Sequence, residues 1–341
     1  MNASFKKHRL EFIKPSGTSR GILTTKDSWF LMLEKDGKSG LGECSLLPNL
    51  SPDDPEKIDS LLQKMCHALQ SNTLLPDLTN WPAVRMGLEM ALLGLQNQTK
   101  WELFPSDFTK GRSSIPINGL VWMGQPDFMK SQIDSLLENG FDCIKLKIGA
   151  LDFNQELEVL SYLRKRYSPK TITIRVDANG AFSTQDALTK LQQLDAFAIH
   201  SIEQPIAVNQ WEEMAGLCRE SPIPIALDEE LISQGSPEER TRLLETIHPQ
   251  YIILKPSLLG GFKASEDWIS EANSLGIEWW ITSALESNVG LNALAQWTYT
   301  LSPKGPQGLG TGSLFKNNIQ CPLTIQKACL GMDNSISWDL I

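Results

Sequence analysis

The sequence lacks the features that mark membrane-spanning and secreted chains. Its longest apolar runs, such as MALLGL at 90–95, are far too short to cross a bilayer. The first residues, MNASFKKHRLEFIK, contain no apolar signal core. We therefore expect no membrane association and a cytoplasmic location.

Basic runs and metal-type cysteine spacings are also missing. No stretch of consecutive Lys and Arg reaches four residues, and the formal net charge is −9. The surface is therefore not suited to a phosphate backbone, and a nucleic-acid partner is not expected. The six cysteines show no C-x-x-C spacing, which predicts scattered reduced thiols, and the four histidines form no cluster. No feature of the sequence specifies an oligomeric state.

The sequence does have enough apolar residues for a large core, 41% of 341. From about residue 110, short β-branched runs alternate with amphipathic helical patterns, which indicates βα units and a parallel sheet. Seven such runs, with an eighth expected near GLGTGSLF at 308–315, favour a closed α/β barrel of the TIM type. The seven runs are IPINGL (115–120), DCIKLKI (142–148), TITIRVD (171–177), FAIHSIE (197–203), PIPIALD (222–228), YIILK (251–255) and EWWITS (278–283).

The first 110 residues have a different pattern. Residues 4–13, 27–36 and 39–44 resemble antiparallel strands, and helices are expected near 55–70 and 82–98. We therefore predict an α+β domain over 1–110 and the barrel over 111–315. The tail, 316–341, either extends the barrel or returns to the first domain, and we favour the return.

Five charged residues stand at the ends of successive predicted strands: Lys147, Asp177, Glu203, Asp228 and Lys255. The intervals between them are 30, 26, 25 and 27 residues, which is one βα unit each. Because the carboxyl ends of barrel strands form one mouth, we expect these side chains to converge. Three carboxylates need a counter-charge, and their hard oxygens are ligands that Mg²⁺ accepts.

Two structural alternatives exist for this set. Each carboxylate alone could cap the helix that follows it, and the whole set could be a structural ion-pair network. The common register and the two bracketing lysines favour a functional site.

The ordered motifs KLKIG, DANGAF, IEQP, LDEE, KPSLLGG and SALESNVGL resemble those of the enolase superfamily, specifically its muconate-lactonizing subgroup. The resemblance implies an α+β capping domain, completed by the C-terminal tail, over a modified (β/α)7β barrel. It also implies Mg²⁺, or Mn²⁺ as a substitute, bound by Asp177, Glu203 and Asp228. In relatives of this kind Lys147 would be the acid/base and Lys255 would lie on the opposite face of the substrate.

Four further residues near this site are notable. Asn179 of DANGAF matches a position near the metal, and Glu229-Glu230 stands where many relatives have a smaller polar residue. Lys145 lies two residues before Lys147, so alternation points both ammonium groups the same way. We expect this like charge, with the metal, to lower the pKa of Lys147 so that it can remove a proton beside a carboxylate and form an enediolate.

The common first step leaves several reactions open. Members of the subgroup include o-succinylbenzoate synthases, N-succinylamino-acid racemases, dipeptide epimerases and muconate cycloisomerases. GLGTG at 308–312 offers no carboxylate for the α-ammonium group of a dipeptide, and SALESNVGL resembles the seventh-strand segment of o-succinylbenzoate synthases. We therefore expect a hydro-lyase that dehydrates 2-succinyl-6-hydroxy-2,4-cyclohexadiene-1-carboxylate in menaquinone biosynthesis. A racemase or epimerase is the alternative, and an inactive binding barrel is the alternative from another class.

The expected substrate is a small dicarboxylate, so a second carboxylate needs a partner. Arg20 in the predicted loop KPSGTSRG (14–21) is one candidate. Backbone N–H groups near Ser283 and at the start of the following helix are another, although Ser287 could instead be a helix cap. The substrate-contact residues expected from these segments are Arg20, Ser283, Glu286, Ser287 and Gly310.

Overall fold

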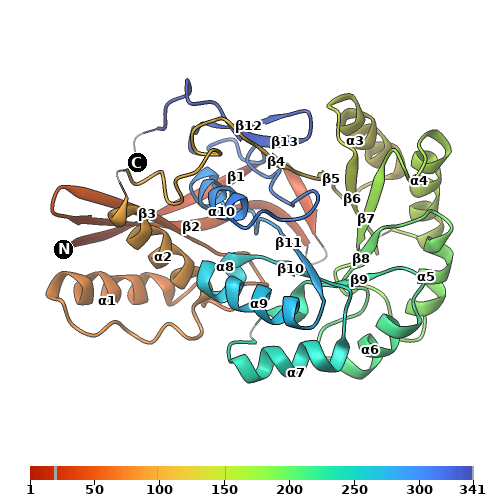
Figure 1. The fold of residues 1–341 in the computed structure, drawn as a ribbon, viewed down its shortest axis with the longest axis horizontal. Coiled ribbons are helices and arrows are strands. Elements are labelled where there is room, and N and C mark those ends of the chain that lie inside the picture. The colour runs from red at the N-terminus through yellow and green to blue at the C-terminus, as the bar shows by residue number, and fades with distance from the viewer. Residues whose placement is uncertain (19–20, 98, 150, 233, 340–341) are drawn as a thin grey trace.

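The computed structural model describes residues 1–18, 21–97, 99–149, 151–232 and 234–339. An antiparallel N-terminal sheet with two helices lies beside a parallel sheet that is flanked by helices (Figure 1). All six cysteines are free thiols, as predicted. Within those residue ranges, no helix has the length and apolar content needed to cross a bilayer.

The N-terminal sheet contains β1 (Asn2–Thr18), β2 (Gly21–Lys35) and β3 (Lys38–Ser45), paired antiparallel in that order, and carries α1 (Ile58–Ser71) and α2 (Pro82–Gln96). The three predicted strands and two predicted helices are thus confirmed. The predicted loop over 14–21 is wrong up to residue 18, because β1 continues beyond a register shift between Glu11 and Ser16. Pro15, which has no N–H to donate, falls inside this irregular part of the strand.

The parallel sheet keeps the chain order of its strands. Ile144 and Leu146 are buried, as alternation predicts for residues that face away from Lys145 and Lys147. In Figure 1 the helices α3 to α7 form an arc along the outer side of the strands. The strands are β5 (Gly119–Val121), β6 (Cys143–Lys147), β7 (Thr173–Asp177), β8 (Ser201–Glu203), β9 (Ile225–Leu227), β10 (Tyr251–Leu254) and β11 (Glu278–Ile281). The helices are α3 (Pro126–Glu138), α4 (Phe153–Arg166), α5 (Ala187–Asp195), α6 (Trp211–Glu220), the 3₁₀ turn η1 (Glu229–Leu231), α7 (Pro237–Ile247), α8 (Pro256–Leu259), α9 (Phe262–Ser274) and α10 (Asn288–Thr300).

Two expected strands differ from the structure. The run 115–120 is divided, because β4 (Ile115–Pro116) pairs with β13 (Cys329–Met332) and only the later residues form β5 in the parallel sheet. Within the described chain, residues 308–315 form no strand element. Instead, Gln307 and Gly308 make parallel bridges to Ile117 and Thr282, so that this short segment pairs with both edges of the sheet.

The C-terminal tail contacts both halves of the chain. Its β12 (Leu323–Gln326) and β13 form a hairpin that extends from β4. Asn317 donates to the Arg9 carbonyl of β1 at 2.7 Å, and Trp338 stacks on Trp101 with ring centroids 4.0 Å apart.

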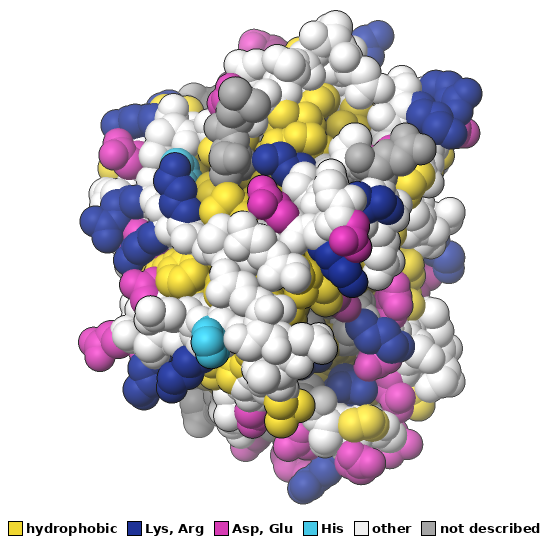
Figure 2. Space-filling view, turned by 90° about the vertical axis from the view of Figure 1, so that its left-hand side faces the viewer, with side chains coloured by type: hydrophobic (Ala, Val, Ile, Leu, Met, Phe, Trp, Pro, Cys, Tyr) yellow, Lys and Arg dark blue, Asp and Glu magenta, His cyan; other side chains and the backbone are white. Residues whose placement is uncertain are grey.

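The outer surface mixes both signs of charge. On the face seen in Figure 2, Lys and Arg side chains are interspersed with Asp and Glu side chains. Among the residues coloured there, no continuous basic field of the kind that binds nucleic acid is present.

Candidate active site

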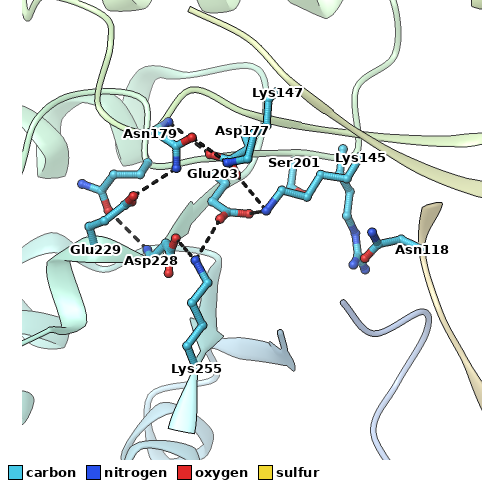
Figure 3. A network of polar contacts seen from close by, with 12 residues as sticks. Asn118, Lys145, Lys147, Asp177, Asn179, Ser201, Glu203, Asp228, Glu229 and Lys255 are labelled. Atoms are coloured by element: carbon cyan, nitrogen blue, oxygen red, sulfur yellow. Dashed lines mark hydrogen bonds and ion pairs between the residues drawn. The ribbon is translucent and has the colours of Figure 1, made fainter. Parts of the chain in front are cut away.

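The strand-end charges lie at one end of the parallel sheet. Register places Lys147 beside Asp177 on β6 and β7, and Asp177 beside Glu203 on β7 and β8. Asp228 and Lys255 directly follow β9 and β10. Figure 3 shows the ammonium groups and carboxylates of this set facing one another. The sequence-predicted convergence therefore follows from parallel pairing of five neighbouring strands.

Every carboxylate of this cluster is in contact with a lysine. Lys145 Nζ and Lys147 Nζ both lie 2.9 Å from the same oxygen, Asp177 Oδ2. Lys145 Nζ also donates to Glu203 Oε2, and Lys255 Nζ donates to Asp228 Oδ2. Asp177, Glu203 and Asp228 are at most 2% exposed, so these pairs lie in a dry, low-dielectric setting.

Burial and charge act against each other at these groups. Burial raises the pKa of Glu203, and the neighbouring Asp177 carboxylate raises it further, so it lies well above its usual range. Burial would also raise the pKa of Asp177, but the ammonium groups of Lys145 and Lys147 hold it well below its ordinary value. Burial lowers the pKa of Lys255, but the adjacent carboxylates raise it more. Lys255 is therefore held in its charged form.

The donor chemistry of the cluster fits a divalent cation. Three buried carboxylates offer hard oxygens, and Glu203 Oε1 accepts no hydrogen bond from any described residue, with Lys255 Nζ 3.9 Å away. Among the described residues, no three His, Cys, Asp or Glu side chains are already arranged as a ligand shell. The lysine pairs account for this, because they hold each carboxylate toward an ammonium group.

Asn179 connects Lys147 to one of the two unexplained glutamates. Its Oδ1 accepts from Lys147 Nζ at 2.7 Å, and its Nδ2 donates to Glu229 Oε1 at 3.0 Å. Asn179 has a φ of 45°, a left-handed conformation that Asn tolerates better than most residues. Glu229 thus fixes the amide orientation of Asn179, and Asn179 in turn holds the Lys147 ammonium group.

A cavity of about 300 Å³ opens in front of these lysines. Its wall combines polar groups at the strand ends with apolar side chains that come both from residues 1–110 and from the later part of the chain. Ser283 and Gly310 line it, as do Lys145, Lys147 and Lys255. The apolar lining residues are Leu23, Leu47, Pro48, Leu50, Leu120, Trp122, Leu136, Phe141, Leu285 and Leu314.

Comparison with known proteins identifies the family. A model of the enolase C-terminal domain-like family matches residues 129–325. The chain belongs to the enolase superfamily. It is 47% identical to the o-succinylbenzoate synthase of Desulfotalea psychrophila, over 97% of this chain and 99% of the relative. The predicted resemblance to this superfamily is therefore confirmed.

Two solved structures match this chain over nearly its full length. A crystal structure of MenC from Desulfotalea psychrophila LSv54 matches with a TM-score of 0.89 and 44% identity, covering 97% of this chain and 99% of that one. The muconate lactonizing enzyme of Pseudomonas fluorescens matches with a TM-score of 0.80 and 22% identity, over 99% and 96% of the two chains, and shows the same fold.

The start of α10, where a substrate carboxylate was expected, is occupied by a carboxylate side chain of the protein itself. Glu43 of β3 accepts hydrogen bonds from the backbone N–H groups of Ser287 and Gly290, both at 2.9 Å. These two N–H groups are thus paired within the chain, and the expectation that N–H groups near Ser283 and at the start of α10 receive a substrate carboxylate stays a prediction. Ser287 is the N-cap of α10, and neither it nor Glu286 lines the cavity. Arg20 lies outside the described residues, so its predicted role stays a prediction.

Glu230 organises the rim in a way that sequence reasoning missed. Its carboxylate accepts from Trp211 Nε1 at 2.7 Å, from Asn209 N at 2.9 Å and from Gln204 Nε2 at 3.2 Å. Gln204 Oε1 in turn accepts from Asp228 N at 3.2 Å. Glu230 therefore joins the segments that follow β8 and β9 and helps to place Asp228. The sequence singled out Glu230 only as part of the Glu229-Glu230 pair and did not indicate these hydrogen-bond partners.

Proposed function

We propose that this enolase-superfamily chain is an o-succinylbenzoate synthase. It would convert 2-succinyl-6-hydroxy-2,4-cyclohexadiene-1-carboxylate to o-succinylbenzoate and water in menaquinone biosynthesis. The near full-length similarity to an o-succinylbenzoate synthase carries the choice of reaction. The lysines and carboxylates at the cavity support its chemistry.

Lys147 performs both proton transfers in this proposal. As a neutral amine it removes the proton on the carbon beside the substrate carboxylate, and the conjugate ammonium then protonates the departing hydroxyl on the same face. One water leaves and the ring becomes aromatic, so the lysine ends in its starting state. Asn179, which contacts Lys147 Nζ at 2.7 Å, holds the amine in place.

Lys255 remains protonated and stabilises negative charge from the other face. The rise in its pKa supports this role, because the neighbouring carboxylates keep it cationic despite burial. We propose that Asp177, Glu203 and Asp228 hold Mg²⁺, with Mn²⁺ as a substitute. When bound, the metal would act as a Lewis acid toward the substrate carboxylate. Lys145, which pairs with Asp177 and Glu203, would keep these ligands in position.

The same proposal includes the finer architecture. The bridges made by Gln307 and Gly308 to both sheet edges support a sheet closed into a (β/α)7β barrel over 111–315. Residues 1–110 would form the capping domain, and 316–341 would return to it, which the contact of Asn317 with Arg9 supports. Six free thiols are consistent with a reducing cytoplasm.

The deciding experiment measures conversion of the cyclohexadiene substrate against a panel of N-succinylamino acids. We expect dehydration to exceed racemisation, to vanish in EDTA and to return with Mg²⁺ or Mn²⁺. Full turnover in metal-free buffer would contradict the metal assignment. Faster racemisation would favour the racemase, and a chain that binds both compounds but converts neither would be a binding protein.

Proton exchange in deuterated buffer separates the two enzymatic readings. A syn dehydration needs one base, so Lys147→Ala should abolish exchange of the α-proton whereas Lys255→Ala should retain measurable exchange. A racemase needs a base on each face, and equal stereospecific losses in the two variants would support it.

A further inference from the structure

The turn between β11 and α10, residues 283–287, forms part of the cavity wall in a strained conformation. Ser283 and Leu285 line the cavity. Leu285 has a φ of 60°, in the left-handed region that a branched apolar residue rarely adopts. Such a conformation persists only where the surroundings impose it. Two of the contacts that hold this turn come from the N-terminal sheet.

Lys26 of β2 is the first of these contacts. Its side chain is 2% exposed, and its Nζ donates to the Leu285 carbonyl at 2.9 Å and to Ser45 Oγ. Burying an ammonium group is costly unless it is well hydrogen-bonded. Here one of its acceptors is the carbonyl of the strained residue itself, 259 positions away in the sequence.

Glu43 of β3 is the second contact. Its Oε1 accepts from Ser28 Oγ at 2.7 Å and from Ser287 N at 2.9 Å, and its Oε2 accepts from Ser287 Oγ at 2.5 Å and from Gly290 N at 2.9 Å. The carboxylate is 1% exposed and lies at the positive end of α10. Gly290 is required for this approach, because an added Cβ would lie 2.9 Å from Glu43 Oε2 and 2.7 Å from Glu286 Cβ.

The hydroxyl of Ser283 is fully used inside the turn. It donates to Glu286 Oε2 at 2.6 Å and accepts from Leu285 N at 3.0 Å and from Thr311 Oγ1 at 2.8 Å. A serine hydroxyl has one proton and two lone pairs, so none remains for a ligand. The turn therefore acts on a ligand through its shape, and that shape depends on where Lys26 and Glu43 hold it.

We propose that Lys26 and Glu43 are positioning residues that fix the 283–287 turn and so set which substrate side chain the cavity accepts. The inference rests on the proposed function only for the identity of the substrate. Loosening the turn should leave the lysines and carboxylates at the strand ends in place. The expected effect is therefore on substrate and product binding, with the proton-transfer step retained.

The test uses Glu43→Gln, which keeps the side-chain shape but replaces one acceptor oxygen by a donor. We expect KM for the cyclohexadiene substrate to rise about tenfold or more, kcat to stay within threefold of the parent, and Mg²⁺ affinity measured by titration calorimetry to be unchanged. Lys26→Met should also raise KM while leaving kcat and Mg²⁺ affinity near the parent values. Lys26→Arg, which retains a donor, should raise KM less than Lys26→Met does. Glu34→Gln and Lys38→Met are matched controls on exposed positions of the same two strands.

Hydrogen exchange of the segment 283–290 supplies a readout that needs no substrate. The Ser287 and Gly290 amides should exchange about tenfold faster or more in Glu43→Gln than in Glu34→Gln. If Glu43→Gln does not fold, Ser28→Ala removes one of the four hydrogen bonds to Glu43 and should give a smaller change in the same direction. A parent-like KM with parent-like exchange, or a fall in kcat with loss of Mg²⁺ affinity, would overturn the inference. Failure of the parent chain to convert the substrate would instead overturn the proposed function, and the exchange result would still decide the anchoring of the turn.

Discussion

At the scale of single residues, the alternation around Lys145 and Lys147 predicts where the two side chains point but not what they contact. Alternation along KLKIG correctly places both ammonium groups on one face, where they reach the same oxygen of Asp177. Burial lowers the pKa of Lys145, but the carboxylates of Asp177 and Glu203 raise it more. The charge of Lys145 is thus compensated by carboxylates on neighbouring strands, which the alternation pattern of β6 alone cannot indicate. Tuning of Lys147 by Lys145 stays a prediction.

His200 carries a pH-dependent part of the stability. Burial, and secondarily the nearby Arg175, lower its pKa from 6.5 to about 4. Between these values the unfolded chain binds a proton that the folded chain does not, so stability is complete above pH 6.5 and falls as the pH decreases toward 4. After discounting for its partial exposure, this term amounts to about 1–2 kcal/mol.

We expect His200→Gln to remove this term. Urea unfolding at pH 7.0 and pH 4.5 should show a loss of stability on acidification that is smaller than in the parent by about 1–2 kcal/mol. His67→Gln, at an exposed position of α1, is the control. An unchanged pH dependence in His200→Gln would mean that the histidine titrates alike in both states.

At the scale of elements, sequence patterns predicted the repeated units better than their edges. The βα rhythm placed β6, β7 and β8 because each has its own apolar period. It missed the division of 115–120 and the pairing of β4 with β13, since two-residue strands have no period and their partner lies more than 200 residues away. It also missed that β1 continues to Thr18, because Gly and Pro indicate a turn where the strand has a bulge.

The packing of α2 on β3 depends on glycine at the contact. A Cβ added at Gly42 would lie 1.8 Å from the carbonyl oxygen of Gly87, and one at Gly40 would lie 1.8 Å from that of Ala91. Both obstructing atoms are backbone, so neither can rotate away. Gly42→Ala should therefore force the helix from the sheet and cost about 2–3 kcal/mol of unfolding free energy.

Gly216→Ala is the matched control for that substitution. Gly216 lies inside α6, and the nearest atom to an added Cβ is 4.0 Å away. The control should gain about 0.5–1 kcal/mol, because alanine is the better helix former. Chemical denaturation of both variants measures the difference. Equal effects would show that the backbone contact between α2 and β3 is not needed for stability.

At the scale of the whole molecule, some parts of the site could be predicted from the sequence and others could not. The strand-end residues Asp177, Glu203 and Asp228 were predictable, since parallel strands bring equivalent positions together. The anchoring of the 283–287 turn was not, because Glu43 of β3 and Ser287, the N-cap of α10, are 244 residues apart in the sequence. A helix N-terminus attracts an anion in general, but only the tertiary structure shows that the anion at the start of α10 is the Glu43 carboxylate.

Charge balance in the shared cavity predicts coupled binding of metal and ligand. The ammonium groups and carboxylates that pair at the strand ends cancel formally, three against three: Lys145, Lys147 and Lys255 against Asp177, Glu203 and Asp228. A divalent cation alone or a dicarboxylate alone would leave this poorly solvated site unbalanced, whereas the two together restore neutrality. Each should therefore strengthen the binding of the other.

Titration calorimetry with Mg²⁺ and the product o-succinylbenzoate measures this coupling. The Kd of Mg²⁺ should fall about 5–100-fold when the product is saturating, and by reciprocity the Kd of the product should fall by the same factor when Mg²⁺ is saturating. Benzoate, with a single carboxylate, should produce a smaller change. If the Kd of each ligand is the same with and without the other, binding does not depend on the summed charge in the cavity. The assignment of Asp177, Glu203 and Asp228 as metal ligands would then lack electrostatic support.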